Sequence, residues 1–276
     1  MVTRGHARSS VFATVDGGAA ELVPDPRRPA GWTVLVDDIA QSYVDLDEPT
    51  WLEFDYARRI AGVIGAVGPP PTPLRVLHLG GGGLTLARYV AASRPGSRQL
   101  VVERDAPLAA LVRQVLPVPD GAGIEVLIDD ARHALAGLAG QRFDLVVCDV
   151  FWSERIPRSV VSGEFAAEVA ALLRPGGLYA MNVTDVPPLA FSRDEAATLR
   201  GAFADVCALT DVDAGADRRF VNVILVGAGP AGLPAGLRSG GPDLLYGKDL
   251  DEWTAGARSM TDATAKDSPP PRPRRR

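Results

Sequence analysis

The chain has 276 residues, of which 46% are hydrophobic and 23% are charged, and its formal net charge is −5. These values exclude a mainly disordered protein and leave enough chain for one large domain or two small ones. Four arginines lie within the last nine residues, so the rest of the chain is more acidic than the total, which argues against a nucleic-acid-binding body.

Membrane, disulfide and metal classes are also disfavoured. No apolar run is long enough to cross a bilayer, and the first twenty residues lack the apolar stretch of a signal peptide. The two cysteines, Cys148 and Cys207, lie in apolar stretches, which excludes a disulfide scaffold and a cysteine-based zinc site. The three histidines have no ligand spacing, so we predict no metal site and expect a cytoplasmic protein.

The first part of the chain predicts a small β region. Residues 1–30 are polar with scattered glycine and proline, and we expect them to be flexible. Residues 31–46 alternate between apolar and polar side chains, which predicts a strand pair or β-hairpin. A helix follows within 52–67 and ends at the prolines of 68–73. We therefore assign 31–67 to an N-terminal β region with a lead-in helix.

From residue 74 onward, short apolar strands alternate with helical segments. Strands are predicted at 75–80, 99–105, 124–130, 143–150, 178–184 and 219–226, and helices at 84–94, 108–116, 131–139, 164–173 and 194–206. Such alternation indicates an α/β fold whose parallel strands are joined by helical crossovers. We assign 68–247 to this Rossmann-like, nucleoside-binding domain, ending in a Gly/Pro-rich loop over 227–247. Residues 248–276 are predicted to hold one short helix and a disordered Arg/Pro tail.

Four glycines, Gly80 to Gly83, follow the first strand of this domain and precede a helix. Glycine permits a backbone to approach a ligand closely, and the unpaired N–H groups of a helix N-terminus attract anions or ligand oxygens. The same pattern also suits a tight turn without a ligand. Because GGGG departs from G-x-G-x-x-G, a dinucleotide is less favoured here than a nucleoside.

Carboxylates end the next three strands of the predicted sheet. Glu103 comes 23 residues after Gly80, where an acid can accept both hydroxyls of a ribose. Asp129 and Asp130 end the third strand, where a carboxylate can accept an amine from an adenine edge, and Asp149 ends the fourth. Each acid alone also fits a helix cap. Because the carboxyl ends of parallel strands meet at one edge of a sheet, their shared placement predicts an adenosine-type site.

At this point the sequence resembles the spermidine synthase (aminopropyltransferase) family over about residues 31–226, and in particular its divergent bacterial spermidine-synthase-like branch. The resemblance is carried, in chain order, by Gln41, Glu53 to Tyr56, the glycines 80–83, Glu103 with Asp105, Asp130 with Ala131, Asp149, Phe165 and the stretch 172–177. The family fold is a Rossmann sheet like that of S-adenosylmethionine methyltransferases, with a small N-terminal β region.

The resemblance implies a site, substrates and an assembly. The family binds decarboxylated S-adenosylmethionine as a cosubstrate, transfers its aminopropyl group to a polyamine and forms homodimers. The cosubstrate-binding residues would be Gln41, Gly80, Gly81, Gly82, Glu103, Asp130, Ala131 and Asp149. Gln41 and Glu103 would face the ribose and sulfur end, and Asp130 would face the adenine. Asp149 and Tyr56 would be the catalytic residues, and Tyr56 would line the amine channel.

Two positions depart from the family pattern. The aspartate of the family's Gly-Gly-Gly-Asp-Gly-Gly turn, which holds the donor's ammonium group, is Gly83 here. The second aspartate of the family's Asp-Ser-Ser-Asp loop, which helps to deprotonate the attacking amine, is Trp152. A protonated amine cannot attack carbon until it loses a proton, and a positioned base typically contributes 10²–10⁴-fold to such a step. Phe151 and Trp152 offer only aromatic faces to a cation.

Three functions therefore stay open at this point. The first is an aminopropyltransferase-like enzyme with an altered acceptor site. The second is an S-adenosylmethionine-dependent methyltransferase, which Gly83 favours because it removes a negative charge that would repel the carboxylate of that ligand. The third is a non-catalytic protein that binds a nucleoside or a protein partner and keeps only the fold.

Overall fold

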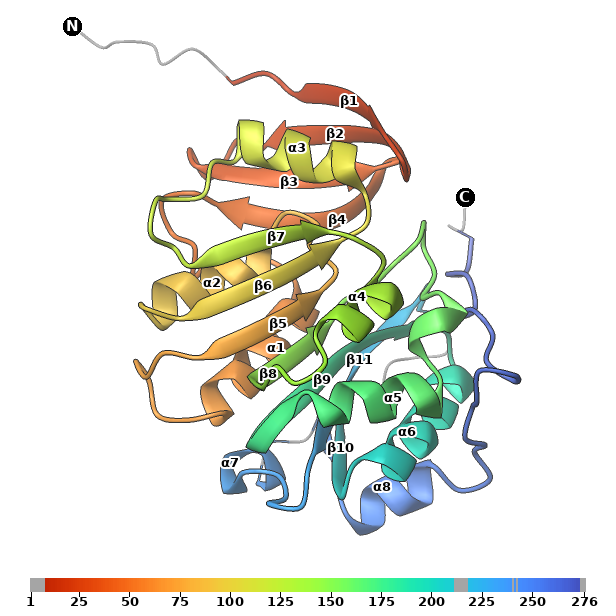
Figure 1. Cartoon of the computed structure of the whole chain (residues 1–276). Coiled ribbons are helices and arrows are strands. Elements are labelled where there is room, and N and C mark those ends of the chain that lie inside the picture. The colour runs from red at the N-terminus through yellow and green to blue at the C-terminus, as the bar shows by residue number, and fades with distance from the viewer. Residues whose placement is uncertain (1–7, 211–217, 240, 242, 274–276) are drawn as a thin grey trace, which may run out of the picture.

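Two β-sheets organise the chain, as the computed structural model shows for residues 8–210, 218–239, 241 and 243–273 (Figure 1). The first sheet is antiparallel, with the strand order β1-β2-β3-β4. Its strands are β1 (Val11–Val15), β2 (Gly18–Pro24), β3 (Gly31–Val36) and β4 (Ile39–Asp45). The predicted β-hairpin over 31–46 is confirmed as β3 and β4.

The region before residue 31 differs from the expectation. Residues 11–24 form the hairpin β1–β2 rather than a flexible segment, and residues 1–7 lie outside the described part of the chain. Val15, Ala20 and Leu22 are buried, so one face of the hairpin belongs to a core. The two-residue period of VFATV and GAAELVP carries this signal, and the surrounding Gly and Pro residues obscured it.

The second sheet has eight strands in the order β12-β10-β11-β9-β8-β5-β6-β7. Their bounds are β5 (Arg75–Leu79), β6 (Arg98–Glu103), β7 (Ile124–Ile128), β8 (Phe143–Cys148), β9 (Leu173–Asp185), β10 (Asp205–Leu209), β11 (Val221–Ala228) and β12 (Leu244–Leu245). The strands from β9 to β7 are parallel, as predicted.

The other edge of the sheet is antiparallel, which the sequence analysis did not predict. β11 pairs with β9 and β10 in the antiparallel sense, and β12 adds to β10 in the same sense. β10 was missed because the predicted helix over 194–206 covers its first residues. The helix ends at Ala202, and the backbone becomes extended at Phe203. The Gly/Pro-rich segment 227–247 likewise holds a short helix and β12 rather than loop alone.

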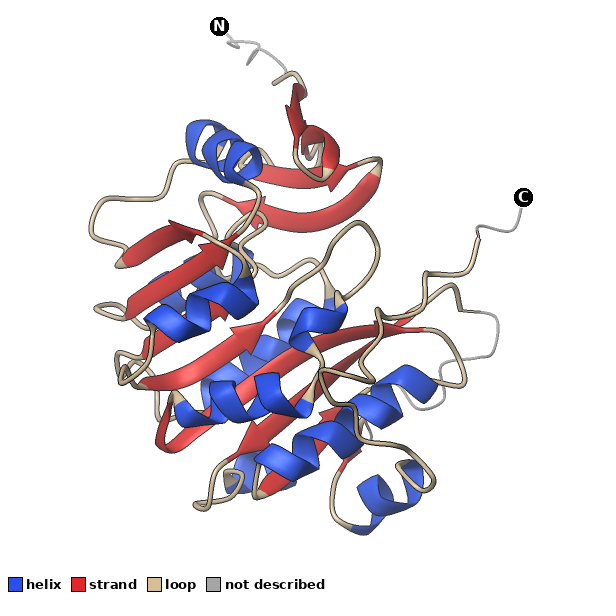
Figure 2. Ribbon diagram, turned by 45° about the vertical axis from the view of Figure 1, so that its right-hand side comes forward, coloured by secondary structure: helices blue, strands red, loops and turns tan. Residues whose placement is uncertain are grey.

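Helices cover both faces of the large sheet (Figure 2). They are α1 (Asp55–Ala66), α2 (Thr85–Ser93), α3 (Ala106–Val115), α4 (Ala131–Gly137), the 3₁₀ turn η1 (Arg158–Val160), α5 (Gly163–Ala171), α6 (Ala190–Ala202), α7 (Ala235–Arg238) and α8 (Lys248–Trp253). One apolar cluster joins α1, α2 and α7 to the sheet, and another joins α4, α5 and α6 to the opposite face. α3 instead packs on the small sheet (Figure 1).

The strand order places a ligand crevice between β5 and β8. The chain runs from β5 to β6 on one side, and later returns to β8 on the other side of β5. In open α/β sheets, ligands bind at the carboxyl ends of the strands at such a reversal of order. The glycines that follow β5 and the Asp149 that follows β8 lie at this point. None of the described helices is both long and apolar enough to span a membrane.

Candidate functional site

The glycine turn after β5 is shaped by its neighbours on β8 and β6. Gly80 has a φ of +93°, and a Cβ there would lie 2.2 Å from the backbone oxygen of Asp149, so no other residue fits. The N–H groups of Gly81 and Gly82 donate to Oε2 of Glu103 at 2.9 and 3.1 Å. The turn is therefore held between the ends of three adjacent strands.

The carboxylates at the strand ends are already engaged in local hydrogen bonds. Oε1 of Glu103 accepts from the N–H of Asp105 at 2.9 Å. Asp105 caps α3 and also accepts from the N–H of Gly17, which ties the β1–β2 hairpin to the large sheet. Asp130 caps α4, with its Oδ1 accepting from the N–H groups of Arg132 and His133. These bonds fix the carboxylates at the sheet edge.

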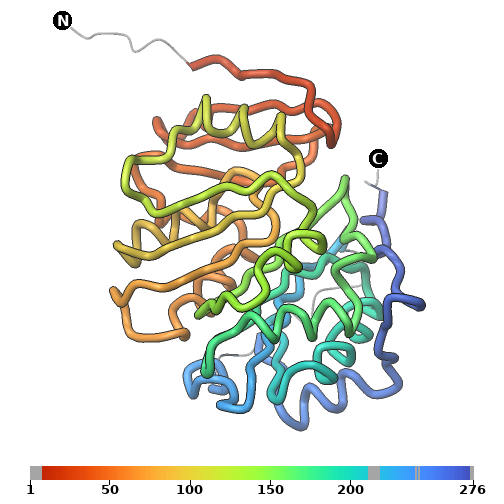
Figure 3. Tube along the Cα trace, viewed as in Figure 1, coloured from red at the N-terminus to blue at the C-terminus, as the bar shows by residue number. Residues whose placement is uncertain are grey.

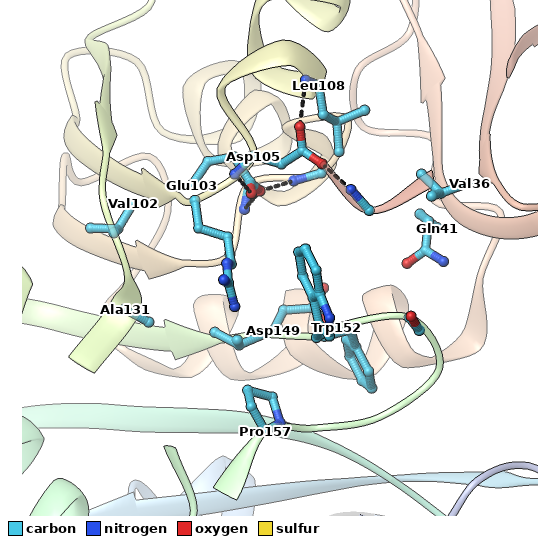
Figure 4. A pocket seen from close by; sticks show the side chains of 18 of the residues that line it. Val36, Gln41, Val102, Glu103, Asp105, Leu108, Ala131, Asp149, Trp152 and Pro157 are labelled. Atoms are coloured by element: carbon cyan, nitrogen blue, oxygen red, sulfur yellow. Dashed lines mark hydrogen bonds between the residues drawn. The ribbon is translucent and has the colours of Figure 1, made fainter. Parts of the chain in front are cut away.

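One cavity, which we call the glycine cavity, collects the predicted cosubstrate-binding residues. Its volume is about 120 Å³. Gln41, Gly80, Gly81, Gly82, Glu103, Asp130, Ala131 and Asp149 all line it. Figure 4 shows Glu103 and Gln41 on its two sides with the indole of Trp152 between them. The fold thus brings these predicted residues together, although they come from five separate segments.

A second cavity, which we call the tyrosine cavity, lies beside the first. Its volume is about 460 Å³, and Tyr56, Asn182, Thr184 and Asn222 are among its lining residues. Gln41, Ile39, Asp149, Phe151 and Ser153 line both cavities. The two cavities therefore meet at Asp149, which is the one carboxylate that lines both of them among the described residues.

The carboxylate of Asp149 is enclosed by neutral partners. Asn182 donates from Nδ2 to Oδ1 at 2.8 Å, and the hydroxyl of Tyr56 donates to the same carboxylate. Burial raises the pKa of Asp149 to about 6, and the hydrogen bonds from Asn182 and Tyr56 oppose that rise. A carboxylate with a pKa just below neutral is mostly ionised at pH 7 and is still basic enough to accept a proton.

The two departures from the family pattern occupy different surroundings. Gly83 lines neither cavity: its N–H donates to Oγ of Ser42, and a Cβ there would lie 2.9 Å from Cβ of Ser42. Trp152 lines the glycine cavity but not the tyrosine cavity, and the guanidinium of Arg104 stacks 4.2 Å above its ring. A second base would have to face the tyrosine cavity in order to act on an amine there. The ring of Trp152 does not face that cavity.

Sequence reasoning missed several residues of these cavities. Asn182 is an amide within the buried and mostly apolar run from Leu178 to Val183 of β9, and that interruption was a usable signal. Arg104, which directly follows Glu103, also lines the glycine cavity and was not predicted as a site residue. Arg59 and Arg219 reach the tyrosine cavity from α1 and from the residues before β11, and no local pattern predicts that meeting.

The C-terminal segment was predicted to be a disordered tail, and this prediction is wrong for residues 267–272. Ser268 is fully buried: its N–H donates to the carbonyl of Ile156, and its Oγ accepts from the N–H of Ile156 at 2.9 Å. Arg158 donates its N–H to Asp267, and Arg272 donates its N–H to the carbonyl of Arg219. The segment (blue in Figure 3) passes along the loop that follows β8 and fixes it.

We expect Ser268→Ala to loosen the loop 150–158. The substitution leaves the buried N–H of Ile156 without an acceptor, and such a loss costs about 1–3 kcal/mol. Local opening should rise about tenfold, so that trypsin cleaves faster after Arg155. Ser259→Ala is the matched control, because its hydroxyl donates to the carbonyl of Ala197, away from this loop. Equal cleavage rates in the two variants would show that the segment does not brace the loop.

Comparisons with known proteins agree with this architecture. No protein-family model matches the chain. A polyamine aminopropyltransferase of Pyrobaculum neutrophilum is 31% identical over 182 residues, which is 62% of this chain and 59% of that protein. One of Vibrio vulnificus is 30% identical over 137 residues, which is 49% of this chain and 45% of that protein. The chain spans about half the length of the curated relatives that it matches.

Solved structures extend the likeness over nearly the whole chain. A probable spermidine synthase from Corynebacterium glutamicum superposes with a TM-score of 0.80 at 28% identity, covering 92% of this chain and 97% of that one. Human methyltransferase-like protein 13 shares the fold alone, with a TM-score of 0.56 at 23% identity over 75% of this chain and 95% of that one. The fold is therefore the methyltransferase-like Rossmann sheet that was expected.

The names of these similar proteins agree with one another. Both curated relatives carry the name polyamine aminopropyltransferase, and the structure that superposes over almost all of this chain is a probable spermidine synthase. The chain is therefore similar in sequence and in fold to polyamine aminopropyltransferases and to a probable spermidine synthase.

Proposed function

We propose that this protein is a transferase that binds an adenosyl sulfonium, such as decarboxylated S-adenosylmethionine, in the glycine cavity. It passes the aminopropyl group to an amine held in the tyrosine cavity. The observation that carries the proposal is the meeting of the two cavities at Asp149. A donor on one side and an acceptor on the other would face each other across this carboxylate.

The cosubstrate residues have distinct roles in the proposal. Glu103 has three hydrogen bonds from backbone N–H groups, which leaves one of its four lone-pair sites for one ribose hydroxyl rather than for the two expected from the sequence. Asp130 and Ala131, at the start of α4, would face the adenine. Gln41 would lie near the sulfur, since it lines both cavities. Gly80, Gly81 and Gly82 would let the backbone approach the nucleoside.

The proposed step is a nucleophilic substitution at carbon. The lone pair of the amine nitrogen attacks the carbon bonded to the sulfonium, the carbon–sulfur bond breaks, and its electron pair stays on sulfur. Methylthioadenosine leaves as a neutral thioether, and Asp149 accepts the proton that the amine loses. Tyr56 and Asn182 orient that carboxylate. One carboxylate with a pKa of about 6 thus takes the place of the family's pair.

The glycine cavity must widen before a nucleoside can enter. At about 120 Å³ it is smaller than the roughly 300–1,000 Å³ of typical ligand sites. Trp152 is 38% exposed and is held by Arg104, so it can swing outward when that stack opens. An exposed cation–π contact contributes about 0.5–1 kcal/mol, whereas micromolar binding supplies about 8 kcal/mol. The stack therefore does not prevent binding.

Calorimetry with three adenosyl ligands tests the proposal. Decarboxylated S-adenosylmethionine and methylthioadenosine should bind, and S-adenosylmethionine should bind more weakly. Tighter binding of S-adenosylmethionine would instead support a methyltransferase. Binding of none of the three would contradict the proposal and support a protein that keeps only the fold.

A further inference from the structure

The C-terminal segment 267–272, which we call the strap, is anchored at both ends (blue in Figure 3). Near its start, the N–H of Ser268 donates to the carbonyl of Ile156 at 3.0 Å, and the N–H of Ile156 donates to Oγ of Ser268 at 2.9 Å. At its end, the N–H of Arg272 donates to the carbonyl of Arg219 at 2.9 Å, and Nε of Arg219 donates to the carbonyl of Arg272 at 2.9 Å. The strap therefore joins the loop that follows β8 to the residues that precede β11.

Three prolines, Pro269 to Pro271, lie between the two anchors. Proline fixes its own φ near about −65° and has no N–H to satisfy, and consecutive prolines favour an extended chain that advances about 3.1 Å per residue. Such a stretch loses little conformational entropy when it is held at both ends, because it is already stiff before it is anchored. The strap is therefore a rigid element of the structure.

Pro271 brings the strap to the tyrosine cavity. It lines that cavity together with Glu154, Arg219 and Phe220. Arg219 is bonded both to the strap and, through Nη2, to Glu154 in the loop that follows β8. The strap, this loop and the residues before β11 therefore form one connected wall of the cavity.

This wall lies at the end of the cavity away from Asp149. On β9, Asn182 donates to Asp149, whereas Asp185, three residues further along the strand, pairs with Val221 at the start of β11. A strand rises about 3.3 Å per residue, so that pair lies about 10 Å further along β9. Arg219 precedes Val221 in the chain and extends beyond the pair. An elongated amine with its nitrogen at Asp149 would therefore meet the wall with its far end.

The charged side chains at this wall compensate one another. Arg219 forms an ion pair with Glu154, and Arg59 forms one with Asp243. Arg218, the remaining arginine of the cavity, is also engaged by a partner. The charges at this end therefore do not select the far end of an acceptor, and the shape of the wall decides which acceptors fit.

We propose that the strap limits the length of the amine that the tyrosine cavity accepts. This inference rests on the proposed function and names the substrate class of the same site, a short amine. With its nitrogen at Asp149, a short amine ends before it reaches Pro271. A longer amine meets the ring of Pro271 and must displace the strap, which breaks the two hydrogen bonds between Arg272 and Arg219.

Two diamines test this limit by calorimetry at pH 8, with the protein saturated with methylthioadenosine. Putrescine and 1,8-diaminooctane carry the same end groups and differ only in the length of the methylene chain. We expect putrescine to bind at least tenfold more tightly. A triple variant, Pro269→Gly with Pro270→Gly and Pro271→Gly, keeps both anchors and makes the strap flexible. It should bind 1,8-diaminooctane about tenfold more tightly than the unmodified protein does, and it should bind methylthioadenosine equally well.

Pro117→Gly with Pro119→Gly is the matched control, because these two prolines are exposed and line neither cavity. This variant should leave the affinities for both diamines unchanged. The inference is overturned if 1,8-diaminooctane binds the unmodified protein as tightly as putrescine does. It is also overturned if putrescine does not bind, or if the triple variant gains no affinity for the longer diamine.

Hydrogen exchange separates a failure of this inference from a failure of the proposed function. In the unmodified protein, the amide of Arg272 should exchange at least tenfold more slowly than the same amide in a peptide of residues 267–276. Equal rates would show that the strap is not anchored, which overturns this inference and leaves the proposed function standing. Failure of methylthioadenosine to bind would overturn the proposed function, and this inference with it.

Discussion

Replacing Asp149 with asparagine should lower turnover by about 10²–10⁴-fold, because the amide cannot accept the proton of the attacking amine. Turnover is measured as the amine-dependent release of methylthioadenosine from decarboxylated S-adenosylmethionine. The affinity for methylthioadenosine itself should change less than threefold, since this ligand is uncharged. Asp120→Asn, in an exposed loop, is the control and should keep full turnover. An Asp149→Asn variant that turns over normally would remove Asp149 from the mechanism.

The same carboxylate predicts a pH dependence of both activity and stability. Turnover should rise with pH through about 6, as Asp149 ionises.

Because the folded-state pKa of Asp149 is raised above the ordinary value near 4, the native state binds more protons than the unfolded chain between pH 4 and 6. The free energy of unfolding of the unmodified protein therefore decreases as the pH rises from 4 to 6. Denaturant titrations should find Asp149→Asn more stable by about 1–3 kcal/mol above pH 6 and no more stable below pH 4.

Glu103→Gln should weaken the binding of methylthioadenosine about 10- to 100-fold in calorimetry. The carboxylate accepts from Gly81, Gly82 and Asp105, and hydrogen bonds to a charged acceptor contribute about 1.5–3 kcal/mol. The amide keeps only one oxygen, so the variant loses part of the bracing of the glycine turn as well as the proposed ribose contact.

Glu125→Gln is the matched control for that experiment. Glu125 lies on the neighbouring strand β7, is exposed and lines neither cavity. Its variant should bind methylthioadenosine like the unmodified protein. Equal affinities in the two variants would mean that the nucleoside does not use Glu103.

Much of the glycine cavity could be predicted from the sequence, because parallel strands bring their carboxyl ends to one edge. A residue that ends a strand is thereby placed without knowledge of its partners, as Glu103, Asp130 and Asp149 illustrate. The tyrosine cavity could not be predicted in this way. Its arginines come from the side of a helix and from the approach to an antiparallel strand, so their positions depend on how distant segments pack.

Composition was misleading at both ends of the described chain. The proline-rich residues 267–272 look like a solvated tail, yet Ser268 is buried against the loop that follows β8. The first hairpin was hidden among glycines and prolines, although its alternating apolar residues form part of a core. In both segments a few well-placed hydrogen bonds and buried side chains outweigh the average polarity of the stretch.

A crystal structure of the protein with methylthioadenosine tests the central claim most directly. We predict that the nucleoside occupies the glycine cavity, with a ribose hydroxyl within hydrogen-bond distance of Glu103 and the adenine beside Asp130. Its thioether sulfur should face Asp149, and Trp152 should be displaced from its stack with Arg104. A nucleoside bound elsewhere, or one in this cavity without contact to Glu103 or Asp130, would contradict the account.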